Sequence, residues 1–224
     1  SWNLPSNIGG YGNIGVDNAG NVYATGGFSG SQNFVINTLV ASGSNDMFLV
    51  KYNSGGTPQW ALHAGASGKD IEGRGVAVDP SGNIYVCGCY TGAMAFYGPT
   101  NSLVKTLPNT VTNDFFIAKY DPSGTLQWVS TATNSGFTPP PPSYWSFDAI
   151  TVDSCSNVYV TGHYVNTATF GTLAPITSAG SADIFVAKCL ADGKWEWVKS
   201  GGGSSDDEGE GITLDKHSDV YVTG

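Results

Sequence analysis

Charged residues are scarce in this sequence. Only 12% of its 224 residues are Asp, Glu, Lys or Arg, about half the share in an average soluble protein. Basic residues are the scarcest, with 9 Lys and Arg against 18 Asp and Glu, so the formal net charge is −9. Nucleic-acid binding needs a cationic surface, and an anionic membrane repels such a chain, so we expect neither kind of partner.

Long apolar runs and helix-forming stretches are also missing. No run approaches the length of a membrane-spanning helix, so we expect no membrane insertion. The opening residues Ser1-Trp2-Asn3-Leu4 do not resemble a signal peptide, and a trimmed chain would begin in the same way. What the sequence does contain is 31 Gly together with 6 Trp, 11 Tyr and 10 Phe. This mixture is typical of many short strands joined by tight turns around an aromatic core.

The four cysteines leave two interpretations open. Cys87 and Cys89 are too close together for a CxxC metal site, and no other metal spacing occurs. The thiols of these two residues, Cys155 and Cys189 are either free and mostly buried, or joined in one or two disulfides in an oxidising compartment.

Internal repetition is the main signal in the sequence. A phrase of the form Val-Asp-x-x-Gly-Asn-Val-Tyr-Val-x-Gly occurs four times, and its anchor aspartates are Asp17, Asp79, Asp153 and Asp215. A second phrase, which begins with Asp and runs through an apolar strand to Lys, occurs three times. Its lysines are Lys51, Lys119 and Lys188, and each is followed by a tryptophan: Trp60, Trp128 and Trp197.

Each phrase predicts a β-hairpin. Asp79 opens a turn in which Gly82 takes the left-handed position, as in a type I turn with a G1 bulge. Ser156 and Ser218 stand where Gly20 and Gly82 stand in the first two copies. Their turns are therefore either strained by about 1 kcal/mol or shaped differently.

One unit is therefore predicted to be four antiparallel strands, a to d, with strands a and c apolar on both faces. A sheet that is covered on both faces requires this pattern. The predicted fold class is all-β, a β-propeller or an open segment of one, with about 3.5 repeats; a β-solenoid is the weaker alternative. The units span residues 12–67, 73–134 and 147–200, with a partial fourth at 206–224. Residues 1–4 are predicted to be the last strand of a preceding unit.

These phrases resemble the bacterial β-propeller repeat called SBBP, and the first phrase also resembles NHL repeats. The resemblance implies a secreted or cell-surface bacterial protein and a propeller that is often seven-bladed. It implies no catalytic residue. Because three full units and two partial ones do not obviously close a ring, we expect further blades in a longer chain, or closure through a partner chain.

Few side chains suggest chemistry. No phosphate-binding loop, HExxH, GxSxG or EF-hand pattern occurs. His63, His163 and His217 fall in different columns of the repeat, so a shared metal site or catalytic triad is not expected. The acidic run at residues 206–210 predicts a solvated loop, with calcium binding as the alternative; no other cofactor is expected.

The repeated carboxylates favour structural roles. The anchor aspartates stand at turn starts, where Asp binds its own backbone. Asp46, Asp114 and Asp183 are expected to bind loop amides, and the repeated lysines to reach a neighbouring blade or solvent. The innermost strands would carry Val16, Ala77, Thr151 and Thr213. None of these side chains is a titratable group of the kind that catalysis needs.

The sequence therefore favours a non-catalytic extracellular or cell-surface module for adhesion, scaffolding or ligand binding. The alternatives are a propeller domain of a secreted hydrolase or lyase, and a structural component of a surface layer or filament. No Asn-x-Ser/Thr sequon occurs, so N-glycosylation is not expected.

Two insertions in the second unit predict the binding surface. Anchor Asp and Lys are 40 residues apart in this unit (79 to 119), against 34 in the first (17 to 51), which places extra residues around Tyr97 to Asn113. The second insertion, around residues 134–146, holds four consecutive prolines followed by Ser143, which favour a stiff loop. A protein or carbohydrate ligand would bind the aromatic residues of both insertions: Tyr144, Trp145, Phe137 and Tyr97. The alternative is that these rings fold back over the blade edge.

Overall fold

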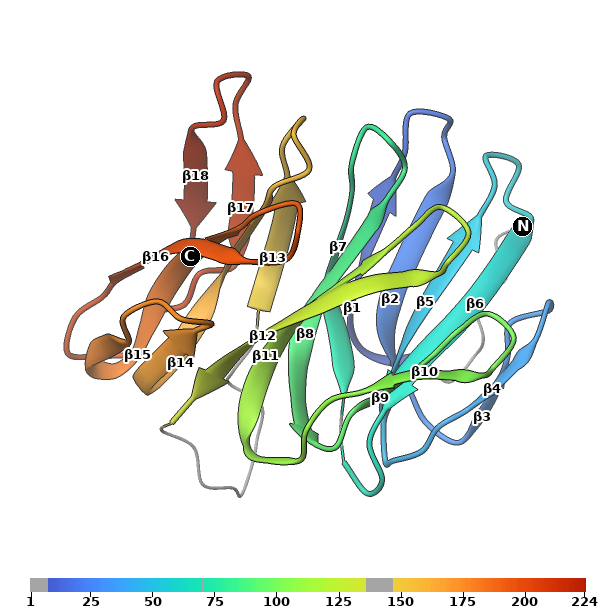
Figure 1. The fold of residues 1–224 in the computed structure, drawn as a ribbon, viewed down its shortest axis with the longest axis horizontal. Coiled ribbons are helices and arrows are strands. Elements are labelled where there is room, and N and C mark those ends of the chain that lie inside the picture. Colours follow the sequence, from blue (N-terminus) through green and yellow to red (C-terminus); the bar gives the residue numbers. More distant parts are fainter. Residues whose placement is uncertain (1–7, 70, 136–146) are drawn as a thin grey trace.

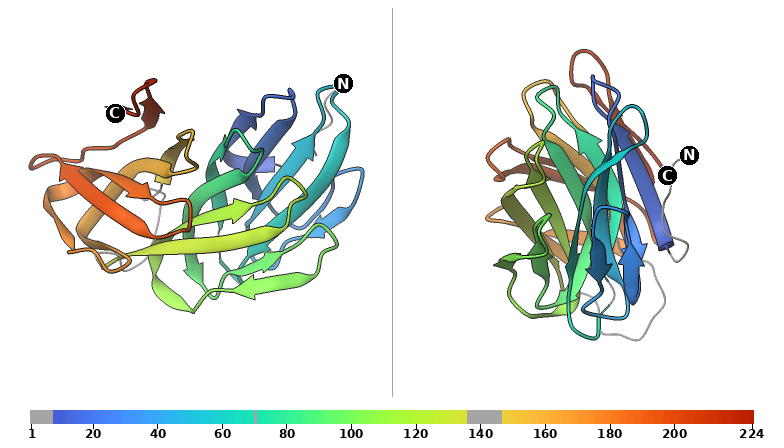
Figure 2. Two further views of the ribbon diagram at one scale, coloured as in Figure 1. Left: turned by 45° about the horizontal axis from the view of Figure 1, so that its top comes forward. Right: turned by 90° about the vertical axis from the view of Figure 1, so that its right-hand side faces the viewer.

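The computed structural model describes residues 8–69, 71–135 and 147–224. Within these ranges the chain forms 18 β-strands and no α-helix. All strand pairings are antiparallel, and the sheets are strongly curled (Figures 1 and 2). The prediction of an all-β chain is therefore confirmed. The predicted strand at residues 1–4 lies outside the described residues.

The strands of the first unit pair in chain order. They are β1 (Ile8–Val16), β2 (Val22–Phe28), β5 (Asp46–Tyr52) and β6 (Pro58–Gly65), and a small hairpin of β3 (Ser31–Asn33) and β4 (Thr38–Val40) lies between β2 and β5 in the chain.

The second unit repeats this order. Its strands are β7 (Glu72–Val78), β8 (Ile84–Gly92), β11 (Thr110–Tyr120) and β12 (Leu126–Asn134). The connection between β8 and β11 contains the hairpin of β9 (Ala95–Tyr97) and β10 (Leu103–Thr106).

The third unit has longer middle strands. Its strands are β13 (Phe147–Val152), β14 (Val158–Phe170), β15 (Ile176–Cys189) and β16 (Trp195–Gly201). A final hairpin of β17 (Gly211–Leu214) and β18 (Val220–Thr223) lies at the end of the molecule away from β5 and β6 (Figure 1).

Neighbouring units are joined in two ways. The first strands of the units, β1, β7, β13 and β17, pack side by side in that order. In addition, the second and third units each pair with the last strand of the unit before, through β9 in the second unit and through the end of β14 in the third. Phe96 in β9 pairs with Ala64 in β6, and Phe170 in β14 pairs with Ala132 in β12. These pairings merge the strands of the first three units into a six-stranded and an eight-stranded sheet.

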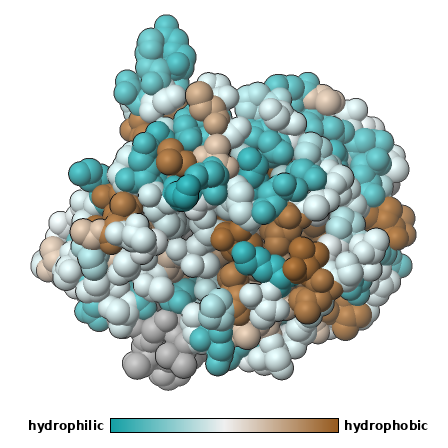
Figure 3. Space-filling model, viewed as in Figure 1, coloured by the Kyte–Doolittle hydropathy of each residue, from teal (hydrophilic) through white to brown (hydrophobic). Residues whose placement is uncertain are grey.

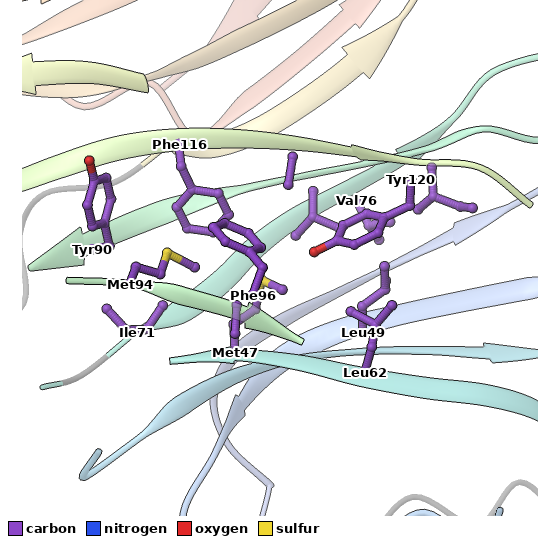
Figure 4. Packing of buried hydrophobic residues seen from close by; sticks show 14 of the residues in the cluster. Met47, Leu49, Leu62, Ile71, Val76, Tyr90, Met94, Phe96, Phe116 and Tyr120 are labelled. Carbon is purple, nitrogen blue, oxygen red and sulfur yellow. The ribbon is translucent and has the colours of Figure 1, made fainter. Parts of the chain in front are cut away.

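The core lies between the layers. One cluster joins Leu49 and Leu62 of the first unit to Val76, Phe116 and Tyr120 of the second (Figure 4). A second cluster joins the second unit to the third. The strand β5 is buried on both faces as predicted.

The strand β1 differs from that prediction. Ile14 and Val16 are 65% and 57% exposed, because no described strand packs on the outer face of β1. Both faces of a strand are buried only when another element packs on each face. The pattern of apolar residues within one strand does not show whether those elements are present.

The predicted turns are present. Gly20 and Gly82 have φ of +77° and +82°, and the amide of each donates to the carbonyl of its anchor Asp. Ser156 and Ser218 take the same left-handed conformation, with φ of +67° and +64°. The strained alternative is therefore the one that the structure shows.

Candidate functional site

A depression of about 190 Å³ lies where three innermost strands run into their first turns. Each unit contributes the same three consecutive positions to it. Valine and aspartate side chains both line it, and Asp79 is buried whereas Val16 is 57% exposed. The lining residues are Val16, Asp17 and Asn18, then Val78, Asp79 and Pro80, then Val152, Asp153 and Ser154.

The aspartates of this depression are held by their own turns. Asp79 Oδ1 accepts hydrogen bonds from the amides of Ser81 and Asn83, both at 2.9 Å. Its Oδ2 accepts from the Asn83 side chain at 2.8 Å and from the Tyr85 hydroxyl at 3.0 Å. The equivalent bonds recur around Asp17 and Asp153. The prediction that these residues bind their own backbone is confirmed.

These bonds keep the carboxylates ionised. Burial alone would raise the pKa of Asp79, but the hydrogen bonds from Asn83, Ser156 and Tyr85 lower the pKa below its ordinary value. The pKa values of Asp17 and Asp153 are lowered in the same way. The depression therefore combines three valine side chains with three negative charges, which favours a cationic or polyhydroxylated group over an anion.

In each of the first three units a repeated set of three side chains lies next to the turn of the anchor aspartate. Tyr85, Lys119 and Trp128 are directly opposite one another on adjacent strands. The Lys119 Nζ lies 5.3 Å from the Tyr85 ring centroid, and the Tyr85 and Trp128 rings are 6.0 Å apart at 56°. Tyr23, Lys51 and Trp60 form the same set in the first unit, and Tyr159, Lys188 and Trp197 form it in the third.

The same tryptophans bind the next unit. Trp60 Nε1 donates to the Pro122 carbonyl at 3.3 Å, and Trp128 Nε1 donates to the Ala191 carbonyl at 3.1 Å. Both acceptors belong to the turn between the third and fourth strands of the following unit. Lys51 Nζ also donates to the Pro122 carbonyl, at 3.2 Å, so the prediction that a lysine reaches a neighbouring unit is confirmed for this residue.

The repeated aspartates of the third strands bind backbone amides, and one of them binds loop amides as predicted. Asp46 accepts from the loop amides of Ser42 and Gly43, whereas Asp183 accepts from the amide of Ala179 within its own strand β15. Asp114 instead accepts from the amide of Asn134 at the end of β12. Asp114 therefore holds the end of β12.

Of the predicted binding residues, only Tyr97 can be placed. Phe137, Tyr144 and Trp145 lie outside the described residues. The Tyr97 ring stacks on the His63 ring, with centroids 4.3 Å apart and planes at 5°. This contact places Tyr97 of β9 against the outer strand β6 of the first unit.

The three histidines lie apart, as predicted. His63 is 2% exposed in β6, and burial lowers its pKa to about 4. His163 Nδ1 lies 3.1 Å from Asp148 Oδ2, and His217 is exposed in the last turn. Among the described residues no three His, Cys, Asp or Glu side chains form a group that could hold a metal ion.

Sequence reasoning missed charged groups at the other ends of the innermost strands. Arg74 Nε lies 3.3 Å from Glu72 Oε2 in β7, and Asp148 of β13 pairs with His163 of β14. The view that these strands carry only Val16, Ala77, Thr151 and Thr213 was therefore incomplete. The sequence does contain a pattern that could have identified these charged residues. Arg74 and Asp148 each stand five residues before an anchor aspartate (74 to 79, 148 to 153).

The four cysteines are free thiols, and all except Cys155 are buried. Burial raises the pKa of Cys89 to about 12, with Asp148 and Glu72 adding to the rise and Arg74 opposing it. Burial likewise raises the pKa of Cys189 to about 12. These thiols act as apolar core groups, because the thiolate is the reactive form.

In the acidic run at 206–210, two carboxylates bind backbone. Asp206 Oδ1 accepts from the amide of Ala182 at 3.1 Å, and Asp207 Oδ2 accepts from the amide of Gly203 at 2.8 Å. These contacts order the loop that leads into β17.

Comparison with known proteins agrees with the repeat signal. Residues 59–88 match the family model described as SBBP, Beta-propeller repeat, which covers β6, β7 and the start of β8. The resemblance noted from the sequence is therefore confirmed for this segment. The chain is also 30% identical over 136 residues to the uncharacterized WD repeat-containing protein L264 of Acanthamoeba polyphaga mimivirus. That match covers 58% of this chain, but the chain spans only 9% of the length of that relative.

The part of the chain that the structure describes contains no helix that is long and apolar enough to cross a membrane.

Proposed function

We propose that this chain forms part of a β-propeller that acts as a non-catalytic binding or scaffolding module. The four-stranded groups at residues 12–67, 73–134 and 147–200, with the hairpin in 206–224, would be successive blades. The packing of β1, β7, β13 and β17 in sequence order supports this arrangement. The match of residues 59–88 to a beta-propeller repeat supports it independently.

The depression supports a role in binding. In this interpretation Val16, Val78 and Val152 lie around the propeller axis, where equivalent positions of successive blades converge. The aspartates that line it use both carboxylate oxygens in their own turns, so they are poorly suited to transfer protons. They still provide negative charge, which fits the binding of a cationic side chain or a sugar hydroxyl. We therefore propose a protein or carbohydrate ligand.

We further propose that the protein is exported from a bacterial cell and works in adhesion or scaffolding outside it. Support comes from the resemblance to the SBBP repeat. Fractionation of the native cells tests this proposal. Recovery of the protein in the extracellular or cell-surface fraction supports it, and recovery in the cytosol contradicts it.

Binding arrays test the role of the depression. The chain is applied to arrays of oligosaccharides and of immobilised matrix proteins, together with Pro80→Trp, which fills the depression, and Thr106→Trp on the exposed strand β10 as the matched control. We expect Pro80→Trp to lose binding at least tenfold and Thr106→Trp to retain it. Equal binding by both variants would place the ligand elsewhere, and turnover of an arrayed sugar by the unmodified chain would favour the hydrolase or lyase alternative.

A further inference from the structure

The strand β10, in the insertion that lengthens the second unit, is a free sheet edge. It pairs with β9 on one side and ends the six-stranded sheet, so that no described strand lies on its other side. All four of its residues are exposed, with Leu103 at 60% and Val104 at 50%. Among the described residues of the second unit, these are the only large apolar side chains that are exposed. Because this unit has a unit on either side, the absence of a neighbouring unit does not explain their exposure.

The hairpin of β9 and β10 holds this edge in place. The Leu107 amide donates to the Met94 carbonyl at 2.8 Å, and the Gly98 amide donates to the Ser102 carbonyl at 2.9 Å. Met94, Phe96 and Leu107 are buried in the cluster that joins the first two units. A strand that pairs with β10 therefore meets a preformed edge, and little conformational entropy of β10 is lost on binding.

The sequence around β10 lacks carboxylates. Residues 80–113 contain no Asp or Glu, although the chain has 18 of them, and Lys105 is the only charged residue in this segment. The chain as a whole carries a formal net charge of −9, so two copies repel one another over the acidic parts of their surfaces. A contact between two copies through β10 brings no carboxylates of this segment together. The distribution of charge therefore favours this edge as the place where two copies meet.

The charges at the two ends of this hairpin are complementary. Lys105 lies in the half of β10 that is away from the turn at residues 98–102. At the turn end Gly124 packs on Pro99, since a methyl group at Gly124 would lie 3.1 Å from the proline ring. Asp121 belongs to the same turn as Gly124. In an antiparallel pair of β10 strands, the half with Lys105 in each copy faces the turn end of the other, where Asp121 supplies the opposite charge.

We propose that β10 is the contact strand of a two-fold dimer. The strand β10 of one copy pairs antiparallel with β10 of a second copy, and Leu103 and Val104 of both copies become buried between them. The six-stranded sheet then continues across the two-fold axis. Identical surfaces meet at such an axis, so a single edge on each copy is sufficient. Backbone hydrogen bonds between the strands provide the affinity, and the apolar side chains provide the specificity.

The proposed dimer is reversible and forms at high protein concentration. One strand of four residues buries less surface than the interface of a permanent dimer. The contact uses neither the depression nor the packing of β1, β7, β13 and β17. A copy in the dimer therefore keeps its depression free, and the dimer presents two depressions to a ligand that carries repeated groups.

Sedimentation velocity of the whole chain, from about 1 μM to about 500 μM, tests the proposal. We expect the weight-average mass to rise with concentration from 23.3 kDa toward twice that value. Val104→Glu places a carboxylate on each edge and should weaken the dimer at least tenfold. Ile14→Glu is the matched control and should leave the dimer unchanged, because Ile14 is 65% exposed and lies on β1 at the other end of the same sheet.

Folding of each variant is checked by its melting temperature, and two milder variants provide a second test. Leu103→Ser removes apolar contact and Lys105→Glu reverses the charge, so each should weaken the dimer at least threefold, while Lys105→Arg should retain it. A mass of one chain at every concentration overturns the proposal and leaves a strand of a different protein as the occupant of the edge. A dimer that survives Val104→Glu and Leu103→Ser, or that is lost with Ile14→Glu instead, also overturns it.

Discussion

The indole N–H of Trp128 donates a 3.1 Å hydrogen bond to the carbonyl of Ala191, a residue of the next unit. The same ring lies against Gly193 of that turn. A single side chain therefore packs inside its own unit, against Tyr85, and outside it, against the turn. The tryptophan column is an element of the unit interface as well as of the unit core.

Trp128→Ala should destabilise the protein by about 3 kcal/mol, near the lower end of the range for loss of a large aromatic side chain, since Trp128 is only partly buried. Trp128→Phe keeps most of the packing and removes the hydrogen bond, so it should cost about 1 kcal/mol. Urea denaturation followed by circular dichroism measures both values. An unchanged midpoint for Trp128→Ala would show that this column is a surface feature.

Gly193→Ala should cost about 2–4 kcal/mol. Part of this cost is the left-handed backbone, with φ of +89°, which is worth about 1–2 kcal/mol. The rest is overlap of the new methyl group with the Trp128 ring. Gly30→Ala is the matched control, because Gly30 has φ of +64° and open space around it. Equal costs for the two variants would contradict close packing of the turn on the indole ring.

The stability of the protein should fall between about pH 6.5 and pH 4 because of His63. The folded state holds this imidazole neutral, since burial lowers its pKa to about 4, while the unfolded chain takes up the proton near pH 6.5. The unfolded state therefore binds more protons across this range, and stability is lost as the pH falls. The full effect is at most about 3 kcal/mol.

His63→Phe should remove this part of the pH dependence and keep the stacking against Tyr97. Comparison of the free energy of unfolding at pH 7.5 and pH 4.5, for the protein and the variant, isolates the contribution of His63 from that of the carboxylates. His217→Gln, in an exposed turn, is the control and should leave the pH dependence as it is. If His63→Phe and the unmodified protein respond equally to pH, His63 is not held neutral.

Ser156 both destabilises and stabilises the folded protein. Its φ of +67° is strained, but its hydroxyl donates a 2.8 Å hydrogen bond to Asp79 Oδ2 in the preceding unit. Ser156→Gly relieves the strain and loses a bond to a charged acceptor, worth about 1.5–3 kcal/mol, so a net loss of about 1 kcal/mol is expected. A double-mutant cycle with Asp79→Asn should give a coupling energy of about 1 kcal/mol. Additive effects would show that this bond between units does not contribute.

The repeated turns and the all-β fold could be predicted because they depend on local chemistry. Asp79 and Gly82 define a turn by their own conformational preferences, and short runs of apolar residues between turns define the strands. The contacts between units could not be predicted in this way. That Trp60 reaches Pro122 depends on how two sheets face each other, which no local preference encodes.

One repeated signal in the sequence was overlooked. Phe34, Phe96 and Phe170 each stand seventeen residues after an anchor aspartate (17 to 34, 79 to 96, 153 to 170), and all three are buried. Each ring packs against a phenylalanine of the third strand in its own unit, such as Phe96 on Phe116 with centroids 6.0 Å apart. The column was hidden because the sequence around it differs in every unit.

The exposed apolar residues could not be predicted either. Leu103 and Val104 of β10 are 60% and 50% exposed, although both fit a buried strand by composition. They lie on an edge strand, and Figure 3 shows hydrophobic side chains gathered on this face of the molecule. Burial here depends on which strand ends the sheet, and this is a property of the topology.

The pairing of β9 with β6 has a consequence for the order in which the chain is synthesised. The outer strand β6 leaves the ribosome before β9, the segment that pairs with its edge. Until Tyr97 has emerged, β6 presents free backbone groups of the kind that pair with other chains. The edge of β12 is left unpaired in the same way until the end of β14 has been synthesised. Each unit is therefore most vulnerable to misassembly while its successor is still being made, and fragments that end at Tyr97 should remain soluble more readily than fragments that end at Gly65.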